Sequence, residues 1–238
     1  MTETPISLVI PCYNPLEGWH DNVVECFKKY QDQLKGVPVH LILVNDGSAR
    51  GVEKKHIEKI SSEIPEFTYH KYEENRGKGH ALREGVRLVN TKLAVTTDID
   101  FPYENHSMVA LTQKLLADKG LILGHRKKDY YQKVPLFRKV LSLSFRATLK
   151  LLLRLNVEDT QCGLKGMDEK VMEVFKRTDI DGYLYDLQLV AKVQAAQLKV
   201  GRVEVRLKSG VEFTNMKASI LIKELKNFLK IWRQSYER

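Results

Sequence analysis

The sequence predicts an α/β fold in which helices cover both faces of a mostly parallel sheet. Apolar, β-branched runs alternate with segments of helical period along most of the chain. The run at residues 37–44 is almost continuously apolar, as expected of a parallel strand that is buried on both faces. The sequence contains no internal repeat, low-complexity tract or linker, so we expect residues 1–238 to form one domain.

The first half of the chain alternates strands and helices regularly. Each expected strand is a short run of apolar or β-branched residues. These runs lie at residues 6–10, 37–44, 67–72, 93–97 and 121–124. The expected helices place apolar residues at helical spacing, as Val23, Phe27 and Tyr30 illustrate in the first of them. These helices lie at residues 21–34, 51–61, 79–89 and 106–117.

The second half is less regular. A long helical segment is expected at residues 135–155, and an irregular, turn-rich stretch follows at 157–166. Two helices, one strand and a closing amphipathic helix are then expected at residues 168–175, 185–196, 200–205 and 217–233. The apolar residues of the closing helix are Leu221, Leu225, Phe228, Leu229 and Trp232. This helix could pack on its own core, form a dimer or lie on lipid.

The composition excludes several classes of protein. Hydrophobic residues make up 43% of the chain and charged residues 29%, which is typical of a globular domain. The longest stretch without an acidic or basic residue, 4–16, is too short to span a membrane. The first five residues lack the basic segment of a secretory signal, and the three cysteines lack metal-ligand spacing. We therefore expect a cytoplasmic protein with reduced thiols.

The net charge of +9 is concentrated in one segment. Residues 126–154 contain nine basic residues and one acidic residue. Such a segment favours an anionic partner: a phosphate-bearing substrate, an acidic membrane surface or nucleic acid. Nucleic acid is the least favoured of the three, because the segment offers few aromatic residues on which bases could stack.

Two of the expected strands end in loops that suit a nucleotide. The first strand runs into Pro11, Cys12, Tyr13 and Asn14, and Tyr13 could form an aromatic wall beside a base. The second strand ends near Asp46, whose carboxylate could accept a hydrogen bond from a base or from a ribose hydroxyl. Taken alone, this second loop is more typical of a turn or a helix cap.

A glycine-containing loop precedes the third expected helix. Gly77 and Gly79 would let a ligand approach the backbone, and the beginning of the helix would offer N–H groups. Lys78 adds a cation beside them. These properties suit a nucleotide, but the loop matches neither the dinucleotide-binding fingerprint nor the P-loop.

Asp98 and Asp100 follow the fourth expected strand. If the backbone turns after Asp98, both carboxylates can point to the same side of the loop. They would then form a site for manganese or magnesium that leaves coordination positions open for phosphate. Two solvated acids in a turn are the alternative. The apolar residues Leu93 to Val95, which precede the pair, favour the metal site.

These four loops, in this order, resemble those of the family-2 glycosyltransferases of GT-A fold, a Rossmann-like sandwich that binds nucleotide diphosphate sugars. The matching segments are Val9-Ile10-Pro11-Cys12-Tyr13-Asn14, Val44-Asn45-Asp46-Gly47-Ser48, Asn75-Arg76-Gly77-Lys78-Gly79 and Asp98-Ile99-Asp100. Later segments are similar to the branch that makes polyprenyl-phosphate sugars, such as dolichyl-phosphate glucose or mannose. They are Gly124-His125-Arg126, Phe137-Arg138 with Ser142, and Asp159-Thr160-Gln161-Cys162-Gly163-Leu164-Lys165. The resemblance extends as far as Arg206.

The resemblance implies a donor site built from these loops. The residues that it implies for the nucleotide sugar are Pro11, Tyr13, Asn14, Asp46, Gly77, Lys78, Asp98, Ile99 and Asp100. Asp98 and Asp100 would also hold the divalent cation, manganese or magnesium, that stabilises a departing diphosphate. Phe101 and Pro102 follow, so water, phosphate or another residue would complete the metal coordination.

The resemblance also implies an acceptor site. Arg126 and Arg138 match positions that grip a lipid phosphate, which is already anionic and needs little help from a general base. A sugar hydroxyl would need a base, for which Asp159 and Asp186 are the candidates. The basic stripe of the helix expected at residues 135–155 could face anionic head groups, or the helix could simply pack on the core.

The favoured function is an inverting, metal-dependent transfer of a hexose from a UDP- or GDP-sugar to a polyprenyl phosphate, at the cytosolic face of the membrane. One alternative keeps the donor but transfers to a glycan or another hydroxyl. Another is a nucleotide-sugar binding protein without catalysis. A homo-oligomer or a membrane partner protein is compatible with all three.

Overall fold

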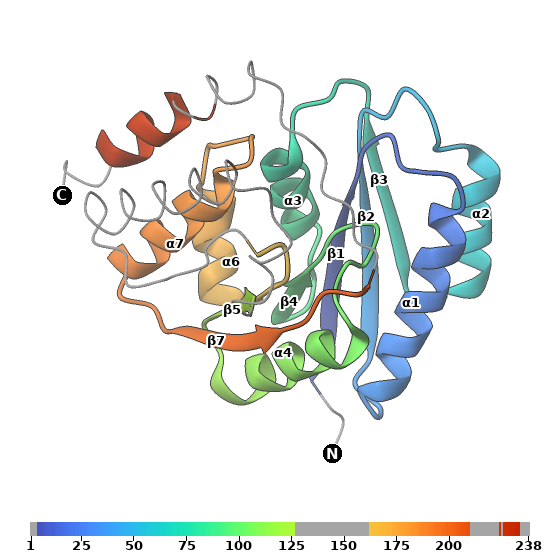
Figure 1. The fold of residues 1–238 in the computed structure, drawn as a ribbon, viewed down its shortest axis with the longest axis horizontal. Coiled ribbons are helices and arrows are strands. Elements are labelled where there is room, and N and C mark those ends of the chain that lie inside the picture. Colours follow the sequence, from blue (N-terminus) through green and yellow to red (C-terminus); the bar gives the residue numbers. More distant parts are fainter. Residues whose placement is uncertain (1–3, 127–161, 210–223, 225, 234–238) are drawn as a thin grey trace.

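A computed structural model describes residues 4–126, 162–209, 224 and 226–233 of the chain. Strands and helices alternate through the first half, as the sequence predicts (Figure 1). The strands are β1 (Ile6–Cys12), β2 (Val39–Asp46), β3 (Phe67–Tyr72), β4 (Leu93–Thr96), β5 (Leu121–Arg126), β6 (Lys165–Asp168) and β7 (Val200–Val205). The helices are α1 (Trp19–Gln33), α2 (Lys54–Glu63), α3 (Lys78–Arg87), α4 (Asn105–Asp118), α6 (Glu169–Lys176) and α7 (Tyr185–Ala195).

The described strands form one sheet in the order β3-β2-β1-β4-β6-β5-β7. The pairs β1·β2, β1·β4, β2·β3 and β5·β7 are parallel, whereas β6 runs antiparallel to both β4 and β5. The predicted α/β class with a mostly parallel sheet is therefore confirmed. Because β1, β2 and β4 are parallel neighbours, their carboxyl ends meet at one edge of the sheet.

Apolar side chains pack on both faces of the sheet. Along β1, Ile6, Leu8 and Ile10 point into a core that α1, α2 and α4 cover, while Val9 points into the opposite core beneath α3, α6 and α7 (Figure 1). All of these β1 side chains are fully buried. Burial on both faces explains why the central strands β1, β2 and β4 are mostly apolar rather than alternating.

Most predicted boundaries are confirmed to within a few residues, and the differences have local causes. Helix α2 begins at Lys54, not at residue 51, because Gly51 has a left-handed φ of 80° and Glu53 forms a capping box with His56. Helix α6 begins one residue later than predicted, since the Asp168 carboxylate caps it by accepting from Val171 N at 3.0 Å.

The stretch at residues 157–166 is predicted to be irregular, but its last two residues belong to β6. This strand has only four residues and includes a buried lysine, so the sequence lacks the apolar run by which a strand is recognised. The helix predicted at residues 135–155 lies outside the described residues.

The C-terminal helix packs on the protein's own core. Residues 226–233 are helical, and Phe228 and Ile231 are buried in the same core cluster as residues of α6 and α7. Leu229, which the sequence pattern places on the apolar face, is instead about half exposed. The Glu224 carboxylate accepts hydrogen bonds from Tyr183 N and Leu184 N, each at 3.0 Å, at the beginning of α7.

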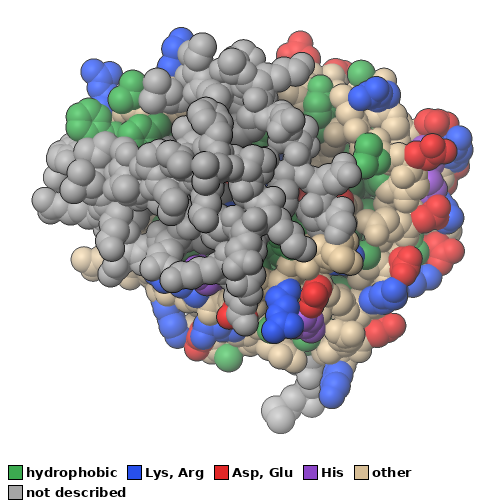
Figure 2. Space-filling view, viewed as in Figure 1, with side chains coloured by type: hydrophobic (Ala, Val, Ile, Leu, Met, Phe, Trp, Pro, Cys, Tyr) green, Lys and Arg blue, Asp and Glu red, His purple; other side chains and the backbone are tan. Residues whose placement is uncertain are grey.

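Charged side chains lie interspersed over the side of the molecule formed by α1 and α2 (Figure 2). Many of them pair across or along these helices, as Lys28 does with Glu63 at 2.5 Å and Lys54 with Glu58 at 3.1 Å. This side therefore carries no large patch of one sign. Nearly all of the predicted basic segment lies outside the described residues. No helix among those described is long and apolar enough to cross a bilayer.

Gly85 tests how tightly α3 is pressed against the sheet. A Cβ at this position would lie 2.3 Å from Val9 Cγ1 and 3.1 Å from Val44 Cγ2. Helix propensity alone predicts that Gly85→Ala stabilises the protein by up to about 1 kcal/mol. We expect the reverse, a loss of about 1–3 kcal/mol in urea unfolding, because the methyl group overpacks the core.

The exposed Ser61→Ala in α2 is the control, and it should stay within about 0.5 kcal/mol of the wild type. An increase in the stability of Gly85→Ala would contradict the close packing described above.

Candidate active site

The loops that follow β1 and β2 are tied together by Asn14. Its backbone N–H donates to Ser48 Oγ at 3.0 Å, and its Oδ1 accepts from Ala49 N at 3.0 Å and Arg50 N at 3.2 Å. Asn14 has a left-handed φ of 44°, which asparagine tolerates better than most residues. The side chain thus fixes the loop that presents Tyr13, which is 51% exposed at this edge of the sheet.

Asp46 organises the glycine-containing loop. Its side chain is only 2% exposed, and its carboxylate accepts from Tyr72 OH at 2.8 Å, Asn75 Nδ2 at 2.8 Å, Arg76 N at 2.8 Å and Gly77 N at 2.9 Å. A carboxylate with this many donors is rigidly held. In the structure, Asp46 joins the end of β2 to the beginning of α3. Its contact with a nucleotide stays a prediction.

The glycines of this loop permit close packing. Gly77 has a φ of 110°, and a Cβ there would lie 2.5 Å from Asp181 O. Gly79 N donates to the same oxygen at 2.9 Å, and a Cβ on Gly79 would meet Tyr185 Cβ at 2.6 Å. Several backbone N–H groups that the sequence suggests for a ligand are therefore bound within the protein.

Asp98 and Asp100 lie in a tight turn. Phe101 N donates to Asp98 O at 3.0 Å, and Phe101 has a left-handed φ of 46°. This is the backbone turn on which the predicted metal site depends. Gly163 passes so near that a Cβ there would lie 2.6 Å from Asp98 Oδ2. Asn22 Nδ2 supports the turn by donating to Asp100 O at 3.3 Å.

Two ion pairs lie next to this turn. Lys78 forms an ion pair with Asp98, and Lys165 Nζ lies 2.6 Å from Asp186 Oδ1. Lys165 and Asp186 are both buried, and Lys165 also donates to Cys162 O. Lys165 is a residue of this site that was not predicted to have a role. A lysine in the short segment Leu164-Lys165-Gly166-Met167, which follows Cys162-Gly163, is the signal that marks it.

Burial and neighbouring charges shift the pKa values of this group. Burial lowers the pKa of Lys78, but the carboxylates of Asp98, Asp186 and Asp100 outweigh this effect and raise it. Burial raises the pKa of Asp186, against the opposing effect of Lys165 and Lys78. Asp100 is exposed, yet partial desolvation and the charge of Asp98 raise its pKa as well.

The residues at the turn fit a divalent cation with open coordination positions. Two carboxylates on one turn are hard oxygen ligands of the kind that Mg²⁺ and Mn²⁺ prefer, and only a glycine at position 163 lets the chain pass beside the Asp98 carboxylate without a clash. Within the described ranges, no cluster of three or more His, Cys, Asp or Glu side chains could hold a metal ion. Phosphate and water oxygens would therefore have to supply the remaining ligands.

The structure brings most of the predicted site residues to one edge of the sheet. Pro11 lies near the end of β1, Tyr13 and Asn14 follow that strand, and Asp46 ends β2. Gly77 and Lys78 lie at the beginning of α3, and Asp98, Ile99 and Asp100 follow β4. Ile99 is partly buried against the core. Arg126 is the last residue of β5 and Asp186 lies in the first turn of α7. Arg138 and Asp159 lie outside the described residues.

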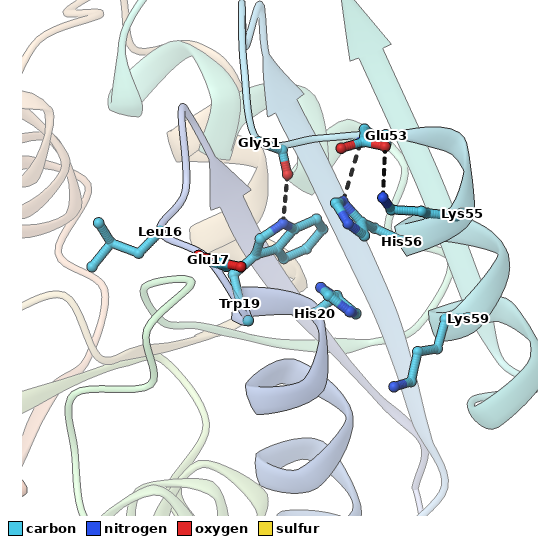
Figure 3. Close-up of a pocket in the computed structure, with 10 residues that line it drawn as sticks. Leu16, Glu17, Trp19, His20, Gly51, Glu53, Lys55, His56 and Lys59 are labelled. Carbon is cyan, nitrogen blue, oxygen red and sulfur yellow. Dashed lines mark hydrogen bonds and ion pairs between the residues drawn. The ribbon is translucent and has the colours of Figure 1, made fainter.

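An open pocket of about 650 Å³ lies between the first turns of α1 and α2 (Figure 3). Its wall includes Trp19 and the stacked rings of His20 and His56, whose centroids are 4.3 Å apart. Lys55 at its rim pairs with Glu53 at 2.9 Å. None of the predicted site residues lines this pocket, so we do not assign it to the donor.

The sequence is similar to known glycosyltransferases. The family model described as "Glycosyl transferase family 2" matches residues 7–175. Dolichyl-phosphate beta-glucosyltransferases from Dictyostelium discoideum and Mus musculus are 24% and 26% identical to this chain over 84% of its length. The chain spans only about two thirds of these relatives, 65% and 66% respectively.

A solved structure confirms the predicted GT-A fold. A mannosyltransferase from Pyrobaculum calidifontis, in complex with GDP-Man and Mn2+, superimposes with a TM-score of 0.63 at 15% identity. The match covers 99% of this chain and 65% of that one.

Asp46→Asn tests whether the carboxylate holds the glycine-containing loop. The amide turns one acceptor oxygen into a donor that faces other donors, so we expect a loss of about 2 kcal/mol in stability. Hydrogen exchange at the amides of Arg76 and Gly77 should become faster. Tyr72→Phe, the control, removes one donor only and should leave that exchange slow. Unchanged exchange in Asp46→Asn would contradict the assigned role.

The Lys165–Asp186 pair can be examined by a double-mutant cycle. Asp186→Leu leaves a lysine that is 1% exposed without its counter-ion, and should cost about 3–5 kcal/mol. Lys165→Met together with Asp186→Leu should recover much of this loss. Additive effects in urea unfolding would show that the two charges are not coupled.

Proposed function

The chain belongs to glycosyl transferase family 2, and on that premise we propose that it transfers a hexose from a nucleotide diphosphate sugar to a polyprenyl phosphate, with inversion at the anomeric carbon. The observation that carries this proposal is the convergence of Asp98, Asp100 and Lys78 at the edge where β1, β2 and β4 end. Such an edge is where α/β sheets bind nucleotides.

The donor side of the proposal depends on charge. Asp98 and Asp100 would hold a manganese or magnesium ion, which stabilises the negative charge that develops on the departing diphosphate. Lys78 would provide a further positive charge to the diphosphate. The structural relative in complex with GDP-Man and Mn2+ supports a nucleotide sugar and a divalent cation. Tyr13, which is half exposed beside the loop fixed by Asn14, would contact the base.

The acceptor side depends on the named relatives and on the basic segment. Two of these relatives are dolichyl-phosphate beta-glucosyltransferases, which supports a polyprenyl phosphate acceptor. Arg126 and Arg138 would grip this phosphate, and residues 126–154 would attract the chain to an anionic membrane on its cytosolic face.

The burial of Asp186 also favours a phosphate acceptor. Asp186 is buried, and its Oδ1 lies 2.6 Å from Lys165 Nζ, which makes it a poor general base for a sugar hydroxyl. An acceptor that is already anionic needs no such base. Asp159 stays the candidate base for a hydroxyl acceptor.

Product extraction tests this function. The full chain is incubated with radiolabelled UDP-glucose or GDP-mannose and Mn²⁺, with and without polyprenyl phosphate. We expect label in the organic phase only when the lipid phosphate is present. Label that enters a water-soluble glycan would instead show a hydroxyl acceptor, and donor binding without turnover would show a protein that only binds nucleotide sugars.

Asp100→Ala should lower the rate of transfer by about 100-fold or more, because the ligand of the cation is lost. Asp32→Ala, an exposed change near the end of α1, is the control and should leave the rate unchanged. Equal activity in both variants would argue against the proposed metal site.

A further inference from the structure

Lys78 and Asp98 form an ion pair at the point where a cation would bind. Lys78 Nζ contacts Asp98 Oδ1, and their side chains are 28% and 29% exposed. The pair is thus open to solvent on one side and packed by protein on the other. In this arrangement the ammonium group occupies a carboxylate oxygen that the proposed metal would use.

The backbone holds Lys78 in this position. Gly77 N donates to the buried Asp46 carboxylate at 2.9 Å, and Gly79 N donates to Asp181 O at 2.9 Å. Both neighbours of Lys78 are therefore fixed, while its four-carbon side chain keeps its rotatable bonds. A lysine on such a support can exchange one anionic partner for another without movement of the loop.

Acidic and basic side chains are clustered around this pair. The carboxylates of Asp98, Asp100 and Asp186 interact electrostatically with Lys78, Lys165 pairs with Asp186, and Lys208 interacts with Asp100. Lys165 is buried and already bound to Asp186 and to Cys162 O. Lys78 is therefore the partly exposed member of the group that can leave Asp98 when another cation arrives.

We propose that Lys78 is an exchangeable counter-ion: it neutralises Asp98 in the donor-free protein and moves to the donor diphosphate when a divalent cation takes its place. This inference rests on the proposed function, because it assumes a diphosphate donor at this edge. Lys78 weakens metal binding before the donor arrives and strengthens donor binding afterwards. Metal and nucleotide then bind cooperatively, and the coupling is reciprocal.

The test measures Mn²⁺ binding by electron paramagnetic resonance, with no substrate turnover. Lys78→Met, Lys78→Arg and the exposed control Lys92→Met are compared with the wild type, each with and without UDP or GDP. Without nucleotide, Lys78→Met should bind Mn²⁺ about tenfold more tightly, because the competing cation is lost. Lys78→Arg and Lys92→Met should stay near the wild type.

With a saturating nucleoside diphosphate, Mn²⁺ affinity of the wild type should rise about 5- to 150-fold, whereas that of Lys78→Met should rise much less. Weaker or unchanged Mn²⁺ binding by Lys78→Met without nucleotide would overturn the inference, provided that its thermal unfolding matches the wild type. If that variant melts early, Lys78→Gln, which also removes the charge, takes its place, and Lys78→Arg stays the variant that keeps the charge.

The two proposals can fail separately. If neither UDP nor GDP binds the wild type in the presence of Mn²⁺, the proposed function fails, whatever the metal-only comparison shows. If nucleotide binds and product forms but the metal affinities of the wild type and Lys78→Met agree, only the counter-ion role fails.

Discussion

The candidate site depends on the buried carboxylate of Asp46. Glycine residues on either side of Lys78 would leave that loop with many conformations, because glycine is sterically unrestricted. The hydrogen bonds from Asn75, Arg76 and Gly77 to Asp46 select one of them. The end of β2 thereby determines where α3 begins, and the beginning of α3 determines where the Lys78 ammonium lies relative to the turn after β4.

The antiparallel strand β6 and the residues before it contribute further side chains to this edge of the sheet. It lies between β4 and β5, and the segment that leads into it brings Gly163 against Asp98 and Lys165 against Asp186. A fully parallel sheet would place a crossover connection here instead. The alternating charges thus come from elements far apart in the sequence, and their position is a property of the mixed sheet.

The sequence predicts the parts of this molecule that depend on local patterns. The apolar run of β2 and the glycine-containing loop around Gly77 are recognisable from neighbouring residues, whereas the turn after Asp98 is a condition of the predicted metal site that the structure supplies. What the sequence does not reveal is pairing across the chain. In the sequence Lys165 is an ordinary charged residue, and its burial follows only from the position of β6 between β4 and β5. In the sequence Asp46 is typical of a turn, and its role follows only from the hydrogen bonds that it accepts from residues 72–77. Both depend on contacts between distant segments, which periodicity cannot predict.

The docking of the C-terminal helix links two regions that are separate in sequence. Glu224 satisfies two backbone N–H groups at the beginning of α7, two residues before Asp186, and a Cβ on Gly182 would lie only 2.1 Å from its Oε1. Glu224 therefore supports the beginning of α7, and Phe228 and Ile231 extend the core that α6 and α7 share. A chain shortened to end before Glu224 would expose the apolar side chains of α7 that Phe228 and Ile231 contact. It would also leave the amides of Tyr183 and Leu184 without their acceptor, so such a truncation is a poor choice for engineering or crystallisation.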